Sequence, residues 1–251
     1  MIEREDVRGV AVVRLAHGKV NALDLELLQA ITATFRELDR ADHTAIVLTG
    51  RGRAFSAGVD LWRIVDGGPD YVRAFLPALS AAFLAVFTSG KPVVAAVNGH
   101  AIAGGAILAC ACDRRLMDDS GGQFGVTELR VGVPFPPVAL EILGHAIGER
   151  AARDAVLGAG TVPPRDAYRR RYVDELVMAE DVTAAAIAAA RQLGSAVPAD
   201  TYRFAKAQLR RPVEERLVRL RPELDPQVEA LWLRGVEDGR IRKYMEQVAR
   251  R

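Results

Sequence analysis

Cysteine is scarce in this 251-residue chain, and the two that occur, Cys110 and Cys112, are separated by a single residue. In the helix expected at this position, side chains two residues apart diverge by about 200°, so the two thiols can share neither a disulfide bond nor a metal ion. We therefore expect both to be small core residues.

Neither sign of charge predominates, and long apolar runs are missing. The chain has 34 lysine and arginine residues and 32 aspartate and glutamate residues, which gives a net charge of +2. This balance does not favour a concentrated basic surface, so neither nucleic acid nor an anionic membrane is an expected partner. The apolar runs, such as 93–97 and 184–190, fall well short of the ~20 residues of a membrane-spanning helix. The first residues carry mixed charges where a secretory signal needs a basic and then an apolar stretch, so we predict a cytoplasmic protein.

Short β-branched runs alternate with helical patterns over the first ~170 residues, and 50% hydrophobic residues suffice for a packed core. This alternation predicts an α/β fold. Strands are expected at 10–15, 45–49, 92–97, 114–117 and 123–124, and helices after the capping residue Asp24, at 70–88 and from about Ala103.

After about residue 177 the strand signals stop, and helical patterns cover 182–193, 201–209 and 226–250. Prolines should mark the joints between these helices because proline cannot continue a helical hydrogen-bond ladder. The relevant residues are Pro198, Pro212, Pro222 and Pro226. We interpret this region as a covering or oligomerising part of the protein.

Two glycine-containing loops follow buried strands. The first, Arg53-Ala-Phe-Ser-Ala-Gly-Val-Asp-Leu61, can leave backbone N–H groups pointing at a ligand, or it is an ordinary turn capped by Asp60. The second, Ala96-Val-Asn-Gly-His-Ala-Ile-Ala-Gly-Gly-Ala-Ile107, opens a helix whose free N–H groups suit an oxyanion, although paired glycines also permit close helix packing. Together the two loops can supply two amides to one oxygen atom.

A third segment, 122–132, places Glu128 among small and apolar residues. Such a carboxylate is either a surface or capping residue or a base with a raised pKa.

The chain resembles the crotonase (enoyl-CoA hydratase/isomerase) superfamily, closely over about residues 5–180. The resemblance rests on an ordered set of motifs: Asn21-Ala-Leu, Ala54-Phe-Ser-Ala-Gly-Val-Asp-Leu, Ala96-Val-Asn-Gly-His-Ala-Ile-Ala-Gly-Gly, Cys112-Asp and Phe124-Gly-Val-Thr-Glu-Leu. It implies a crotonase-like spiral of ββα units in residues 1–180 and a C-terminal helical trimerisation region in residues 181–251. It also implies homotrimers, or hexamers built as dimers of trimers, that act on acyl-CoA as substrate, without a metal or redox cofactor.

The resemblance assigns roles to matched positions. The oxyanion-hole amides fall on Val59 and Gly104, and Glu128 takes the position of a catalytic carboxylate. The remaining positions form the substrate-binding set: Val20 and Ala22 in an early loop, Arg53 near the CoA phosphates, Ala54, Ser56 and Ala57 along the adenine and pantetheine, and Asp60, Leu61, Gly105 and Ile107 beside the oxyanion positions.

One departure bears on the reaction type. A hydratase of this family carries two glutamates, and here the first of these positions holds Ile107 while the second holds Glu128. Adding water to a conjugated double bond requires holding and deprotonating water while delivering a proton, which isoleucine cannot do. A single glutamate can instead move a proton from C2 to C4 of a 3-enoyl thioester, as in the family's Δ3-Δ2-enoyl-CoA isomerases.

The leading hypothesis is therefore an enoyl-CoA isomerase. An enoyl-CoA hydratase of low activity and a noncatalytic acyl-CoA binding protein are the alternatives. Asp66, Asp70 and Glu141 are candidate substitutes for the missing carboxylate.

Overall fold

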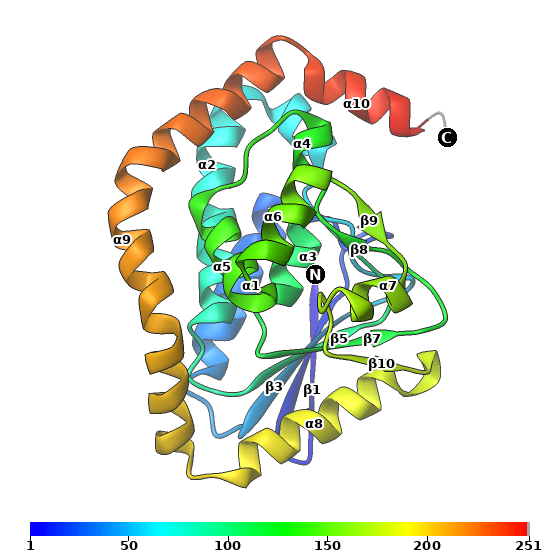
Figure 1. Ribbon diagram of the computed structural model, residues 1–251, viewed down its shortest axis with the longest axis vertical. Helices are drawn as coiled ribbons and strands as arrows, with labels where there is room; N and C mark the ends of the chain where they lie inside the picture. Colours follow the sequence, from blue (N-terminus) through cyan, green and yellow to red (C-terminus); the bar gives the residue numbers. More distant parts are fainter. Residues whose placement is uncertain (250–251) are drawn as a thin grey trace.

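The structure, a computed structural model, describes residues 1–249 and contains two sheets joined by helices (Figure 1). The main sheet has the order β1-β2-β3-β5-β7-β10. Its first two strands are antiparallel, and the other neighbouring pairs are parallel. The strands are β1 (Ile2–Val7), β2 (Val10–Leu15), β3 (Ala45–Gly50), β5 (Val93–Val97), β7 (Arg114–Asp118) and β10 (Glu175–Val177).

A smaller sheet takes one short strand from each successive unit, in the order β4-β6-β8-β9. Its strands are β4 (Ala54–Ser56), β6 (His100–Ile102), β8 (Phe124–Gly125) and β9 (Thr161–Val162). The order β3-β4-α2, β5-β6-α3 and β7-β8-α4 therefore repeats a ββα unit three times, which confirms the expected spiral. The helices of these units are α2 (Leu61–Phe87), α3 (Gly104–Cys110) and α4 (Glu128–Val131).

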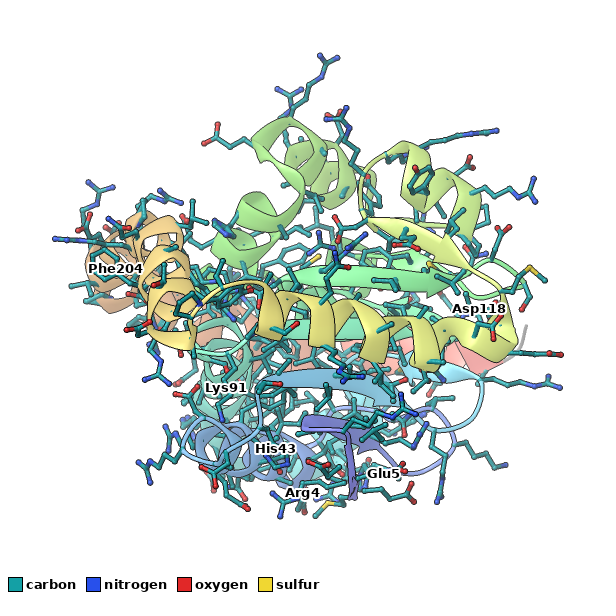
Figure 2. The ribbon with its side chains drawn as sticks, turned by 90° about the horizontal axis from the view of Figure 1, so that it is seen from below. Arg4, Glu5, His43, Lys91, Asp118 and Phe204 are labelled. Atoms are coloured by element: carbon teal, nitrogen blue, oxygen red, sulfur yellow. The ribbon has the colours of Figure 1, made fainter. Side chains whose placement is uncertain are left out.

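Both faces of the main sheet are covered, which explains why β3 and β5 are buried at every residue. One face belongs to the main core beneath α1 (Leu25–Leu38), α2 and α3. The other packs against α8 (Val182–Ala196), whose Val182, Ala186 and Ala190 are buried on it; Figure 2 shows α8 lying along the sheet.

The remaining helices surround these layers. They are α5 (Pro137–Ile147), α6 (Glu149–Gly158), α7 (Pro164–Arg169), the 3-10 turn η1 (Ala179–Asp181), α9 (Ala199–Glu237) and α10 (Arg240–Ala249). In Figure 1, α9 runs along one side of the molecule against α2 and α5.

The predicted strand at 10–15 and the helix capped by Asp24 are confirmed: the Asp24 side chain accepts a hydrogen bond from Leu27 N. Both cysteines are buried and unbonded, as expected. The helix predicted at 70–88 is confirmed as the longer part of α2, and a further helical segment precedes it from Leu61. The two segments meet in a kink at Gly68, whose φ of 65° is not helical and which comes directly before Pro69.

The prediction that helices end at Pro212, Pro222 and Pro226 is wrong. Only Pro198 lies at a helix boundary, because α9 continues through Pro212, Pro222 and Pro226. Buried apolar residues such as Leu217 and Trp232 hold α9 against the core despite the hydrogen bonds lost at proline. The helical segment predicted to end at Arg250 is divided at Gly239 (φ 74°), and Arg250 itself lies outside the described residues.

Among residues 1–249, α2 alone is long and apolar enough to cross a membrane by length and composition, which the apolar runs of the sequence did not indicate. Half of its most apolar window is buried inside the protein. Together with the bend at Gly68, this packing is that of a core helix of the folded chain.

Candidate active site

The loop after β4 presents an amide without an acceptor. Leu23 N donates to Gly58 O at 2.8 Å, and Asp60 N donates to Leu23 O at 3.0 Å. These two bonds fix the residues on either side of Val59 against the segment around Leu23. The Val59 N–H lies between them and donates to no acceptor in residues 1–249.

The loop after β6 presents further free amides at the start of α3. Ala103 precedes the helix with a φ of 52°, and its carbonyl accepts hydrogen bonds from Ala106 N at 2.9 Å and Ile107 N at 3.1 Å. The amides of Gly104 and Gly105 come too early in the helix for an intrahelical acceptor. Within the described part of the chain, neither has a backbone partner outside the helix.

The two loops are in contact. A Cβ atom added to Gly58 would lie 2.7 Å from Ile102 O and 3.3 Å from Gly104 N. One added to Gly104 would lie 3.7 Å from Val59 Cγ2. The structure therefore brings Val59 and Gly104 together, and Gly58, with a φ of 88°, is required for this approach.

Asn21 holds the first loop in place through hydrogen bonds, a role that the sequence did not reveal. Its side-chain nitrogen donates to Ala54 O at 2.8 Å and Phe55 O at 3.3 Å, and its carbonyl accepts from Ser56 Oγ at 2.8 Å. Its φ of 51° is one that asparagine tolerates better than most residues. The sequence singled out Asn21 only as the start of the Asn21-Ala-Leu motif, which does not reveal partners more than thirty residues away.

Glu128 is the first residue of α4, beside the second loop. Residues of β6 pair with β8, and Ala103 N donates to Gly125 O at 2.8 Å, so the start of α4 lies next to the start of α3. The Glu128 Oε2 atom is buried and has no hydrogen-bond partner among residues 1–249. Burial raises the pKa of Glu128 to about 7, against the opposing effect of backbone N–H groups of Thr127 and Glu128.

This raised pKa predicts a stability effect. A carboxyl whose folded-state pKa lies above its ordinary 4.5 favours folding at low pH and opposes it as pH rises through about 7. We expect Glu128→Gln to be more stable than the unmodified protein at pH 8, by roughly 3 kcal/mol at most. Urea unfolding at pH 5 and pH 8 measures this, and the difference should largely vanish at pH 5. Equal stability of the two proteins at pH 8 would mean that burial does not destabilise the ionised form of Glu128.

The candidate substitute carboxylates are engaged in ion pairs. Asp66 pairs with Arg242 at 3.4 Å and Asp70 with Arg73 at 2.9 Å, both with exposed side chains. Glu141, on α5, pairs with Arg216 at 2.7 Å.

The other predicted binding residues lie along the first loop and around the two helix starts. Val20 is exposed, and its carbonyl accepts from Ala57 N at 3.0 Å, which holds the early loop against the β4 loop. Ser56 is buried and uses its hydroxyl within the loop, bonding to Asn21 O and Gly58 N. The Asp60 side chain caps α2 by accepting from Arg63 N at 3.1 Å.

The remaining members of this set differ in exposure. Arg53 is exposed at the loop entrance, and Ala22 and Leu61 are half-buried. Ala54, Gly105 and Ile107 are buried, and Ile107 belongs to the main hydrophobic core. Within residues 1–249, no group of three or more His, Cys, Asp or Glu is placed to hold a metal ion.

Comparison with known proteins identifies the family of the chain. A family model described as enoyl-CoA hydratase/isomerase matches residues 5–230. Human mitochondrial enoyl-CoA delta isomerase 1 is 30% identical over 221 residues, covering 87% of this chain and 73% of the relative. A probable enoyl-CoA hydratase of Mycobacterium bovis is 32% identical over 224 residues, covering 86% and 83%.

A solved structure extends the match to the whole fold. The crystal structure of human mitochondrial Δ3-Δ2-enoyl-CoA isomerase aligns with a TM-score of 0.87 at 27% identity, covering 99% of this chain and 98% of that one. The chain therefore has the crotonase fold and belongs to the enoyl-CoA hydratase/isomerase family.

Proposed function

We propose that the chain is a Δ3-Δ2-enoyl-CoA isomerase in which Glu128 is the proton shuttle and the amides of Val59 and Gly104 form the oxyanion hole. The observation that carries the proposal is the buried, unpartnered Glu128 Oε2 beside the second loop, with a pKa near 7. A carboxyl with such a pKa exchanges protons readily near neutral pH, as a shuttle must.

The reaction needs one base and one stabilised oxygen. Ionised Glu128 removes a proton from C2 of a 3-enoyl thioester, and the negative charge of the resulting dienolate develops on the thioester oxygen. The free amides of Val59 and Gly104 donate to that oxygen. The neutral Glu128 then returns the proton to C4, and the double bond moves from C3–C4 to C2–C3 without loss or gain of atoms.

The loop around Ala54, Ser56 and Ala57 is proposed to contact the adenine and pantetheine of the acyl-CoA substrate, with Arg53 near its phosphates. The exposed position of Arg53 at the loop entrance suits this role. No metal or redox cofactor enters the proposed reaction.

We extend the proposal to a cytoplasmic homotrimer or dimer of trimers. Exposed apolar residues on α9, among them Phe204, Leu209 and Val218, suit burial against further copies. Light scattering coupled to size-exclusion chromatography distinguishes the two assemblies from a monomer.

Ile107 tests the choice between isomerase and hydratase. It is buried one helical turn after Gly104, where a second carboxylate would have to reach. We expect Ile107→Glu to introduce measurable hydration of 2-enoyl-CoA, with Ile107→Gln as the uncharged control of similar shape. If the unmodified protein already hydrates 2-enoyl-CoA at about 1 to 10³ per second, rates typical of enzymes, another carboxylate holds the water and the isomerase proposal fails.

A further inference from the structure

The side chain of Tyr71, which the proposed reaction does not use, reaches from α2 to the start of α1. Its hydroxyl oxygen accepts a hydrogen bond from Leu25 N at 3.0 Å. Leu25 is the first residue of α1, where the helix offers this N–H no acceptor of its own. The bond therefore ties the part of α2 that follows the kink to the first turn of α1.

The kink in α2 accommodates this side chain closely. A Cβ atom added to Gly67 would lie 2.6 Å from Tyr71 Cβ and 2.7 Å from its Cγ, so a larger residue does not fit there without displacing the tyrosine. The Tyr71 ring also stacks on Phe75, one turn further along α2, with 6.0 Å between the ring centres. These contacts on both sides hold the ring, and with it the hydroxyl, in one position.

Leu25 is close in the chain to the segment that fixes the Val59 amide. Two residues before it, Leu23 bridges to Val59 and exchanges backbone hydrogen bonds with the residues on either side of it. The first segment of α2, 61–67, begins two residues after Val59. The chain thus forms a closed circuit, from Val59 through the first segment of α2 to Tyr71, across the hydrogen bond to Leu25, and back through Leu23.

Another polar contact between α1 and α2 is weaker. Arg63 pairs with Glu26 at 2.6 Å, but the two side chains are 48% and 47% exposed, and exposed ion pairs contribute little because water solvates both charges. Apolar packing between the two helices is non-directional. The hydrogen bond to Tyr71 is therefore the contact best suited to fix the first turn of α1 relative to α2.

We propose that Tyr71 is a positioning residue for the oxyanion hole: by accepting the Leu25 N–H, it sets the place of Leu23 and, through it, the direction of the Val59 N–H. This inference rests on the proposed function and deepens it. Misplacing a catalytic group by 1 Å costs up to about 10²-fold in rate. Because the backbone bonds of Leu23 remain when the hydroxyl is lost, we expect a smaller loss, of roughly tenfold.

The bond can be removed from either end. Tyr71→Phe removes the acceptor and keeps the ring. Leu25→Pro removes the donor, since proline is accepted at the first position of a helix and Asp24 before it already has the extended backbone (φ −103°, ψ 175°) that proline requires. Leu25→Ala is the matched control, because it shortens the side chain and keeps the N–H.

Steady-state kinetics with 3-enoyl-CoA should separate positioning from binding. We expect Tyr71→Phe to lower kcat about tenfold with KM nearly unchanged, and Leu25→Pro to lower it by a similar factor relative to Leu25→Ala. The double variant should be no slower than Leu25→Pro, since both substitutions remove the same bond. Thermal unfolding checks that each protein is folded at the assay temperature, and Tyr71→Phe, which loses one oxygen atom, decides alone if Leu25→Pro does not fold.

A spectroscopic measurement reports on the amide itself. Hydrogen bonds from the oxyanion hole polarise the thioester carbonyl, so the ¹³C signal of carbonyl-labelled butanoyl-CoA, which has no double bond to move, should shift on binding. We expect a smaller shift in Tyr71→Phe than in the unmodified protein. This signature does not change if Tyr71 contributes to stability alone.

The outcomes separate this inference from the proposed function. If the unmodified protein converts 3-enoyl-CoA and shifts the carbonyl signal, then equal kcat and an equal shift in Tyr71→Phe overturn the inference alone. An additive loss in the double variant, or a raised KM with unchanged kcat, also overturns it. An unmodified protein that neither converts 3-enoyl-CoA nor shifts the carbonyl signal overturns the proposed function and the inference together.

Discussion

Under the proposed function, replacing Glu128 by Gln should lower isomerase turnover by roughly 10²- to 10⁴-fold, the contribution of a general acid-base group, and leave acyl-CoA affinity nearly unchanged. The amide preserves the shape of the side chain but cannot accept the C2 proton. Steady-state kinetics with 3-enoyl-CoA and calorimetric titration with a nonreactive acyl-CoA separate the two effects. Unchanged turnover in a folded Glu128→Gln protein would remove Glu128 from the mechanism.

The pH profile provides a check that does not require a mutation. Because Glu128, the proposed base, has a pKa near 7, kcat/KM should rise about tenfold per pH unit below that value and level off above it. A profile that is flat from pH 5 to 8 would show that no group titrating near neutrality limits proton removal.

The second large effect is expected at Gly104, whose proposed contribution is a backbone amide and not a side chain. Gly104→Pro removes the N–H while keeping a residue that the first position of a helix tolerates. We expect catalysis to fall by at least ~10²-fold, the usual loss of one oxyanion donor. Circular dichroism and size-exclusion chromatography should show an unchanged fold and assembly.

Gly104→Ala is the matched control because it retains the N–H. Its added Cβ would lie 3.1 Å from Leu23 Cδ1, the end of a flexible side chain that can move slightly. We expect it to keep most of the activity. A folded Gly104→Pro protein with full activity would make Gly104 a packing residue and place the oxyanion hole elsewhere.

The sequence predicted those parts of the fold that depend on local pattern. Buried β-branched runs located β2, β3 and β5, and Asp24 marked the start of α1 because its side chain caps the helix locally. The two glycine loops were also readable as a pair, since each follows a buried strand, and the structure places Val59 and Gly104 in contact.

Features that depend on distant partners could not be predicted. Asn21 bonds carbonyls more than thirty residues away, and α9 passes through three prolines because Trp232 and its neighbours pack against the core. Asp113, directly before β7, pairs with Lys206 and Arg210 of α9, which are 93 and 97 positions away in the chain. The unpartnered Oε2 of Glu128 is likewise a property of the folded surroundings.

The most direct test of the account is product identification when the purified protein is incubated in parallel with 3-enoyl-CoA and with 2-enoyl-CoA. We predict that 3-enoyl-CoA is converted to 2-enoyl-CoA at about 1 to 10³ per second, and that 2-enoyl-CoA yields no 3-hydroxyacyl-CoA at comparable rates. Rapid formation of 3-hydroxyacyl-CoA, or binding of both thioesters without conversion of either, would contradict it.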